Sequence, residues 1–181
     1  HCISSAASDV YKRQNDGSRD RTWSLIEELH KDNSFVEGLS LAKNVGSELA
    51  VMAGMMAARE RADVVVTIDA DLQDDVETIE EMINQYLEGC DIVYGVKTSR
   101  EADPWLKRIT AEGFYRLQQN MGINVIFNHT NFRLMSKRAL EALSEYSERN
   151  LYLRGIIPQL GFRSAEVEDV IRERTAGESK Y

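Results

Sequence analysis

The chain has 181 residues, of which 43% are hydrophobic and 29% charged, as is ordinary for a soluble globular domain. Its formal net charge of -8 argues against a nucleic-acid-binding protein, which would normally present a basic patch. Two cysteines and three scattered histidines form neither a disulfide framework nor a zinc site, so a reducing compartment is expected.

Residues 1–14 are predicted to be a non-native segment. They have neither the basic start nor the apolar centre of a signal peptide, and residues 4–14 resemble the translated end of a sequencing adapter. A flexible natural N-terminus is the alternative. The domain itself is then expected to cover residues 15–181.

The first part of this domain is predicted to alternate between turns, helices and strands. Asn15-Asp16-Gly17-Ser18 is a turn signal, and the apolar spacing after it predicts a helix to about Lys31. A short strand is expected within 36–42. A second turn follows, and leucine, methionine and alanine at helical spacing predict a helix over 47–60.

The stretch 64–74, with the sequence VVVTIDADLQD, is the most informative part of the chain. Its short β-branched run predicts a strand buried on both faces of a parallel sheet. Ligands bind beyond the carboxyl ends of such strands, which is where Asp69, Asp71, Gln73 and Asp74 would lie. Clustered oxygen ligands without histidine or cysteine suit a hard cation, so Mg2+ or Mn2+ is expected.

An acidic helix N-terminus is the alternative explanation for these carboxylates. It accounts for Asp75 but not for Asp69 or Asp71, because the next predicted helix begins only near Val76 and runs to about Leu87. With the strand expected over 91–95, the alternation implies an α/β domain with helices on both faces of a mainly parallel sheet.

The second half departs from this alternation. A polar loop is expected over 97–103, and then a basic amphipathic helix over 104–120 that could lie on a membrane surface or pack on its own domain. The remaining predicted elements are a strand at 132–135, helices at 136–144 and 151–160, a strand at 164–172 and a loose end.

Three stretches together resemble the family 2 glycosyltransferases with the GT-A fold. They are the turn at 15–18, the N-x-G element Asn44-Val45-Gly46 and the D-x-D element Asp69-Ala70-Asp71. Within that family the chain is most similar to the polyprenyl-phosphate sugar transferases, on the residues 69–74, 94–95, 103–108, 132–135 and 176–181. The resemblance implies a three-layer GT-A domain truncated at both ends, without the family's first strand and its C-terminal membrane helices.

The resemblance also implies a metal-dependent, inverting transfer of a sugar from a nucleotide-sugar donor to a polyprenyl phosphate. The metal would be held by Asp71, with Asp69 and Gln73 nearby. The nucleotide sugar would be contacted by Asp16, Asn44, Gly46 and Asp69.

The acceptor phosphate is already anionic, so catalysis would rest on positioning and on stabilising the leaving diphosphate rather than on a strong base. Arg133 is the first candidate for binding this phosphate, because a guanidinium matches its geometry. Lys97 and Arg100 are second candidates, with a solvated charged loop as the alternative. Asn131 stands where the family commonly has Asp, and an amide cannot serve as a base, which would impair a hydroxyl-acceptor enzyme more than a phosphate-acceptor one.

The implied partners are the donor, the lipid phosphate and the membrane surface, reached through the 104–120 helix and the C-terminal helices. The full-length protein is thus expected on the cytoplasmic face of a membrane, and no nucleic acid is expected to bind. The alternatives are a family 2 enzyme with a different acceptor, an inactive nucleotide-sugar-binding fragment, and a haloacid-dehalogenase-like phosphatase. The phosphatase normally has Thr or Val where Gln73 stands.

Overall fold

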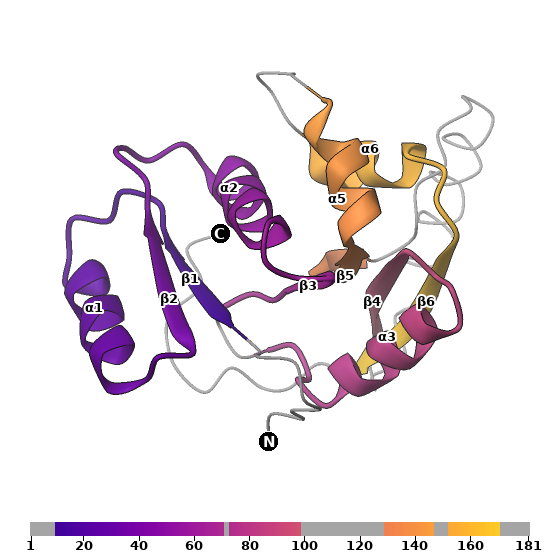
Figure 1. Cartoon of the computed structure of the whole chain (residues 1–181), viewed down its shortest axis with the longest axis horizontal. Helices are drawn as coiled ribbons and strands as arrows, with labels where there is room; N and C mark the ends of the chain where they lie inside the picture. Colours follow the sequence, from indigo (N-terminus) through magenta and orange to yellow (C-terminus); the bar gives the residue numbers. More distant parts are fainter. Residues whose placement is uncertain (1–9, 71–72, 99–128, 147–151, 171–181) are drawn as a thin grey trace, which may run out of the picture. The chain divides into compact units, whose positions relative to one another are not determined.

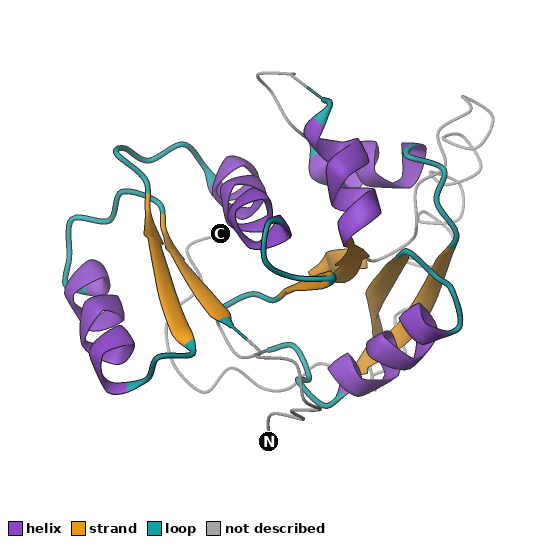
Figure 2. Cartoon of the chain, in the orientation of Figure 1, coloured by secondary structure: helices purple, strands orange, loops and turns teal. Residues whose placement is uncertain are grey.

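The computed structural model describes residues 10–70, 73–98, 129–146 and 152–170. By internal contacts the chain divides into two compact units, the first ending at Asp63 and the second beginning at Val64. Each unit is described by itself. Figure 1 labels their elements, and Figure 2 shows which segments are helix and which are strand.

The first unit is a parallel strand pair between two helices. β1 (Tyr11–Asn15) pairs with β2 (Val36–Ser40), and α1 (Thr22–Asp32) connects them. The helix α2 (Ser47–Arg59) follows β2 and lies on the other side of the pair from α1 (Figure 1). This arrangement follows from the alternation of side chains along a strand, since one face of the pair meets α1 and the other meets α2.

A glycine sets the spacing between α1 and β2. A Cβ added at Gly38 would lie 2.6 Å from the Ile26 side chain and 3.0 Å from that of Trp23. Ile26 is the buried residue of α1. The helix therefore rests directly on the strand backbone, and any larger residue at position 38 would push it away.

The predicted helices and strand of this unit are confirmed, with ends that differ by one or two residues. The strand β1 runs directly into the turn at Asp16. The expectation that the family's first strand is missing stays a prediction. Residues 11–14 of β1 belong to the segment predicted to be non-native, and that origin stays a prediction.

The second unit contains a four-stranded sheet in the order β3-β5-β4-β6. Its strands are β3 (Val64–Thr67), β4 (Ile92–Thr98), β5 (His129–Ser136) and β6 (Ser164–Val170). β5 runs antiparallel to both of its neighbours, whereas β4 and β6 are parallel. The helices are α3 (Thr78–Leu87), α5 (Lys137–Ser144) and α6 (Leu153–Gln159).

The α/β class is confirmed, but this sheet is mixed rather than mainly parallel. The prediction that residues 64–67 are buried on both faces is wrong, since all four residues of β3 are half-buried. Among the strands that the structure describes, β3 pairs only with β5. β5 and β4 each have a partner on both sides, and their residues 132–136 and 92–95 are buried.

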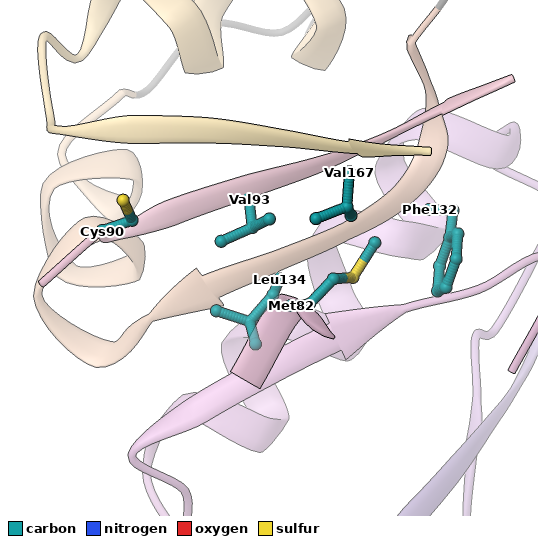
Figure 3. Packing of buried hydrophobic residues seen from close by; sticks show 6 residues of the cluster. All are labelled: Met82, Cys90, Val93, Phe132, Leu134 and Val167. Carbon is teal, nitrogen blue, oxygen red and sulfur yellow. The ribbon is translucent and has the colours of Figure 1, made fainter. Parts of the chain in front are cut away.

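The core of the second unit lies between α3 and the sheet. Met82 of α3 is fully buried and packs among the cluster in Figure 3, whose other members are Cys90, Val93, Phe132, Leu134 and Val167. A Cβ at Gly95 would lie 2.7 Å from the Phe132 ring and 3.2 Å from the end of the Met82 side chain. The helix thus approaches the centre of the sheet closely because β4 carries a glycine beneath it.

The structure describes no helix that is long and apolar enough to cross a membrane. The helix predicted over 104–120 lies outside the described residues.

Candidate functional site

In the first unit, the turn after β1 and the N-x-G element are joined by hydrogen bonds. Oδ1 of Asp16 accepts the backbone N–H of Val45 at 2.7 Å, and Oδ2 accepts that of Gly46 at 3.0 Å. The Asn44 side chain donates to the Asp16 carbonyl at 3.1 Å. Two motifs that lie almost thirty residues apart in the sequence therefore form one structure.

The Asp16 carboxylate lies at the N-terminus of α2, which begins one residue after Gly46. The unsatisfied amides and the positive dipole end of a helix both favour a negative charge there. Gly46 has a φ of +91°, a backbone conformation that favours glycine. Asp16 thus serves as the cap that α2 does not obtain from a residue of its own.

Further hydrogen bonds fix the strand end next to this turn. The buried Asn15 accepts the N–H of Ser18 at 3.0 Å and donates to Ser40 Oγ of β2 at 3.1 Å. Gly17 has a φ of +65° and lies directly against the backbone of Lys43 and Asn44. Asp16, Asn44 and Gly46, three of the four residues predicted to bind the nucleotide sugar, are thus brought together. Their contact with a nucleotide stays a prediction.

In the second unit, the ends of β3, β4 and β6 and the start of β5 lie at one edge of the sheet. This follows from the register, because β5 is antiparallel to its neighbours and begins beside the residues where they end. The hydroxyl of Thr67 donates to the carbonyl of Asn131, which fixes the end of β3 against β5. The sequence-predicted residues Asp69, Asn131 and Arg133 therefore lie toward this end of the sheet, and Lys97 lies near it on the face that α3 covers.

The turn that follows β3 is held by two buried carboxylates. Asp74 Oδ2 accepts the backbone N–H of Asp69 at 3.2 Å, and Asp169 Oδ1 accepts that of Asp75 at 2.9 Å. Lys97 Nζ lies 3.3 Å from Asp74 Oδ1. Asp74 is 3% exposed and Asp169 is fully buried, so water screens this charged group very little.

Burial raises the pKa of the Asp169 carboxyl above its usual range, and the neighbouring Asp74 raises that pKa further. The hydrogen bond from the Asp75 amide and the positive charge of Lys97 act in the opposite direction on the same pKa. Desolvation is the largest of these effects, as expected for a carboxyl without water around it.

Arg133 occupies the centre of β5 on the face opposite Met82. It is 1% exposed, and its Nη2 donates to Asn131 Oδ1 at 3.3 Å. In register it lies between Thr67 and Tyr94. Burial raises the pKa of the Tyr94 hydroxyl to about 12, with the Arg133 charge acting against that rise.

The predicted metal ligands can be placed in part. Asp69 and Gln73 are half-buried and lie on either side of Asp71, which is outside the described residues. Within the described ranges no three His, Cys, Asp or Glu side chains are grouped to hold a metal ion. The oxygen donors of Asp69 and Gln73 do fit the chemistry of a hard cation.

The prediction that Lys97 lies on a mobile loop is wrong. β4 continues to Thr98, and Lys97 is within it, opposite Asp169 of β6 and paired with Asp74. The polar composition of 97–103 predicted a loop. A lysine can lie in β4 because it forms an ion pair with Asp74, and local sequence does not reveal a partner that is distant along the chain. Arg100 lies outside the described residues.

Asp169 was missed as a site residue, although the sequence carries a signal for it. Ala165, Val167 and Asp169 alternate along β6, so they share one face of the strand. Val167 belongs to the core cluster, and the acidic residue two positions later must therefore enter the domain near the core. A carboxylate at a buried strand position requires polar partners.

Comparisons with known proteins agree on one family. A family model described as "Glycosyl transferase family 2" matches residues 14–144. The uncharacterized glycosyltransferase YkoT of Bacillus subtilis (strain 168) is 54% identical over 166 residues, which are 92% of this chain and 49% of that protein.

Two further relatives match the same share of the chain. The uncharacterized glycosyltransferase YkcC of Bacillus subtilis (strain 168) is 39% identical over 168 residues, 92% of this chain and 51% of that protein. The bactoprenol glucosyl transferase of Shigella phage SfV is 40% identical over 168 residues, 92% of this chain and 54% of that protein. The chain thus spans about half the length of these relatives.

Proposed function

The chain belongs to glycosyl transferase family 2, and on that premise we propose that the whole protein transfers a sugar from a nucleotide-sugar donor to a polyprenyl phosphate. Relatives from Shigella phages carry the name bactoprenol glucosyl transferase, which pairs a glucosyl group with a polyprenyl lipid. The observation that carries the proposal is the gathering of Asp69, Asn131 and Arg133 at one edge of the sheet.

In the proposed reaction an oxygen of the acceptor phosphate attacks the anomeric carbon of the donor sugar. A carbon–oxygen bond forms on one face of the sugar while the bond to the nucleoside diphosphate breaks on the other, so the configuration inverts. The acceptor oxygen is already anionic and requires no strong base, which agrees with an amide at position 131. Positioning and stabilisation of the leaving group then supply most of the rate enhancement.

The turn at 15–18, the N-x-G element and the D-x-D element are proposed to bind the donor. Asp16, Asn44 and Gly46 would contact the nucleoside part, and Asp69 the sugar nucleotide near its diphosphate. A divalent cation, Mg2+ or Mn2+, held by Asp69, Asp71 and Gln73 would supply charge neutralisation of the leaving diphosphate.

Arg133 is proposed to bind the acceptor phosphate. Asn131, which accepts a hydrogen bond from Arg133, is a neutral amide and brings no negative charge to the guanidinium. An aspartate at position 131 would bring a negative charge that opposes a phosphate. Lys97 is a weaker candidate for binding the acceptor phosphate because it already pairs with Asp74. Arg100 stays a candidate on the basis of the sequence alone.

Contact with the lipid would require the membrane surface. The basic helix predicted over 104–120 and C-terminal helices of the whole protein are proposed to supply that contact, on the cytoplasmic face of the membrane.

The test uses the full-length protein with nucleotide sugars, Mn2+ and polyprenyl phosphate. A lipid-linked sugar product supports the proposal. Release of phosphate from simple phosphoesters would instead support a phosphatase, and donor binding without turnover would support a binding protein. Asp71→Ala should abolish metal-dependent donor binding, whereas Asp32→Ala, an exposed carboxylate at the end of α1, should not change it. Unchanged donor affinity in Asp71→Ala would remove the metal assignment.

A further inference from the structure

We propose that Asp169 is a positioning residue of this site, which acts with Asp74 and Lys97 to hold the turn 69–75 in place against β4 and β6. The inference rests on the proposed function, because its consequence is the position of the metal-binding D-x-D element. It assigns a role to a buried cluster in which Lys97 and Asp169 are remote in sequence from the motif.

The two carboxylates fix the turn at both of its ends. Asp74 binds the amide of Asp69, the first residue of the D-x-D element, at 3.2 Å. Asp169 binds the amide of Asp75, four residues after the end of the D-x-D element, at 2.9 Å. The backbone is therefore anchored at Asp69, a proposed ligand, and again two residues after the proposed ligand Gln73.

The cluster is tied to the sheet by the strand register. Lys97 and Asp169 are opposite each other on β4 and β6, and they follow Gly95 and Val167 by two residues. Gly95 and Val167 face α3, so Lys97 and Asp169 point to the same face. The lysine then pairs with Asp74 at 3.3 Å and joins the turn to β4.

A purely structural role would not require these residue types. Burying two carboxylates and an ammonium group has a desolvation cost that well-packed apolar side chains at the same positions would avoid. An apolar cluster, however, could not form the directional hydrogen bonds to the backbone amides of Asp69 and Asp75. Residues that orient metal ligands in this way typically change metal affinity by about 10–100-fold when they are removed.

Three substitutions at position 169 distinguish the effect of losing the hydrogen bond to the Asp75 amide from the effect of changing the packing around the side chain. Asp169→Leu fills the site with an apolar side chain of similar size but cannot accept the Asp75 N–H. Asp169→Ala removes the acceptor and leaves a cavity. Asp169→Asn retains an acceptor oxygen of the same geometry and is the conservative rescue. The matched control is Asp91→Ala, because Asp91 is also a buried carboxylate of this sheet and lies at the opposite end of β4.

The first measurement uses the metal-free full-length protein and follows the exchange of backbone amide hydrogens. In Asp169→Leu, exchange within residues 69–75 should accelerate at least tenfold, while exchange in α5 stays unchanged. Asp169→Asn should stay within threefold of the wild type. Unaltered exchange at Asp75 in Asp169→Leu would overturn the inference without any reference to metal or turnover.

The second measurement titrates Mn2+ in the presence of nucleotide sugar. The Mn2+ concentration for half-maximal donor binding should rise at least tenfold in Asp169→Leu and Asp169→Ala, together with the KM for the donor. The KM for polyprenyl phosphate should stay within twofold. If Asp91→Ala raises the Mn2+ midpoint equally at the same loss of melting temperature, Asp169 is merely structural and the inference is wrong.

The two proposals fail in distinguishable ways. If the wild-type protein shows no Mn2+-dependent donor binding, the proposed function and the positioning role fall together. If the wild type binds donor with Mn2+ and Asp169→Leu has the same Mn2+ midpoint, only the positioning role is refuted.

Discussion

Substituting Gly17 by alanine tests the contact between the turn at Asp16 and the N-x-G element. Gly17 has a φ of +65°, and a Cβ there would lie 2.6 Å from the backbone N of Asn44 and 2.7 Å from the backbone C of Lys43. These are backbone atoms and cannot rotate away as a flexible side chain would. The loop that contains them must move instead.

Two contributions set the magnitude of the effect. The left-handed backbone costs an alanine about 1–2 kcal/mol. Restoring ordinary contact distances requires the loop to shift by about 1 Å. That shift would stretch the bonds from Asp16 to Val45 and Gly46, now 2.7 and 3.0 Å, beyond hydrogen-bonding distance. Each such bond to a charged group contributes about 1.5–3 kcal/mol, so losing both bonds on top of the left-handed strain should cost about 4–8 kcal/mol.

Gly161 provides the matched control for this prediction. It has a φ of +71° after the end of α6, and no atom lies within 4 Å of an added Cβ. Gly161→Ala should therefore cost only the left-handed strain, about 1–2 kcal/mol. Unfolding by urea measures both variants, and titration with nucleotide sugar should show at least a tenfold loss of affinity for Gly17→Ala alone. Equal stability losses in the two variants would refute the argument from backbone contact.

Three further predictions concern the second unit. Met82→Ala should lower the free energy of unfolding by about 2–5 kcal/mol, measured with urea, because Met82 is fully buried between α3 and the sheet. Ser136→Ala should cost about 2–4 kcal/mol and leave sugar transfer unchanged, because the Ser136 hydroxyl caps α5 by accepting the Ala139 N–H at 3.3 Å and donates to the buried Asp91 carboxylate at 2.8 Å. The ion pair with Arg138 lowers the pKa of the Asp91 carboxyl, so its stabilisation is present above the unfolded pKa of about 3.9 and is lost as pH falls through the lower folded pKa. In Arg138→Ala the melting temperature should therefore fall less than in the wild type as the pH is lowered below about 4. An equal fall in both proteins would contradict this assignment.

Local sequence patterns predicted the helices well because helix formation depends on residues three and four apart. The helix expected over 47–60 is α2 from Ser47 to Arg59, and the helix ending before Gly89 is α3. At Gly89, which has a φ of +96°, the backbone turns out of the helix as the sequence suggested. The D-x-D element also follows a strand end, as expected from the β-branched run before it.

Strand pairing could not be read in the same way, because it depends on residues far apart in the chain. The run 64–67 looks like a central strand by composition, yet its residues are half-buried, whereas β5 is buried over 132–136 although it contains Arg133. The position of β5 between two partners buries this charged residue. The same limitation hid Lys97, whose ion pair with Asp74 becomes visible only when β4 and the turn after β3 are placed together.

The acidic residues near the strand ends have two different roles, which the sequence alone does not separate. Asp16, Asp74 and Asp169 each bind backbone amides of a turn or of a helix start, and so fix the loops at the candidate site. A carboxylate with this role contributes to preorganisation, and its loss would weaken ligand binding even if it never touched the ligand. Loss of activity after substitution of such a residue is therefore no proof of direct contact. The assignment of donor contacts should rest on variants in which the exchange of the bound backbone amides is unchanged in the ligand-free protein.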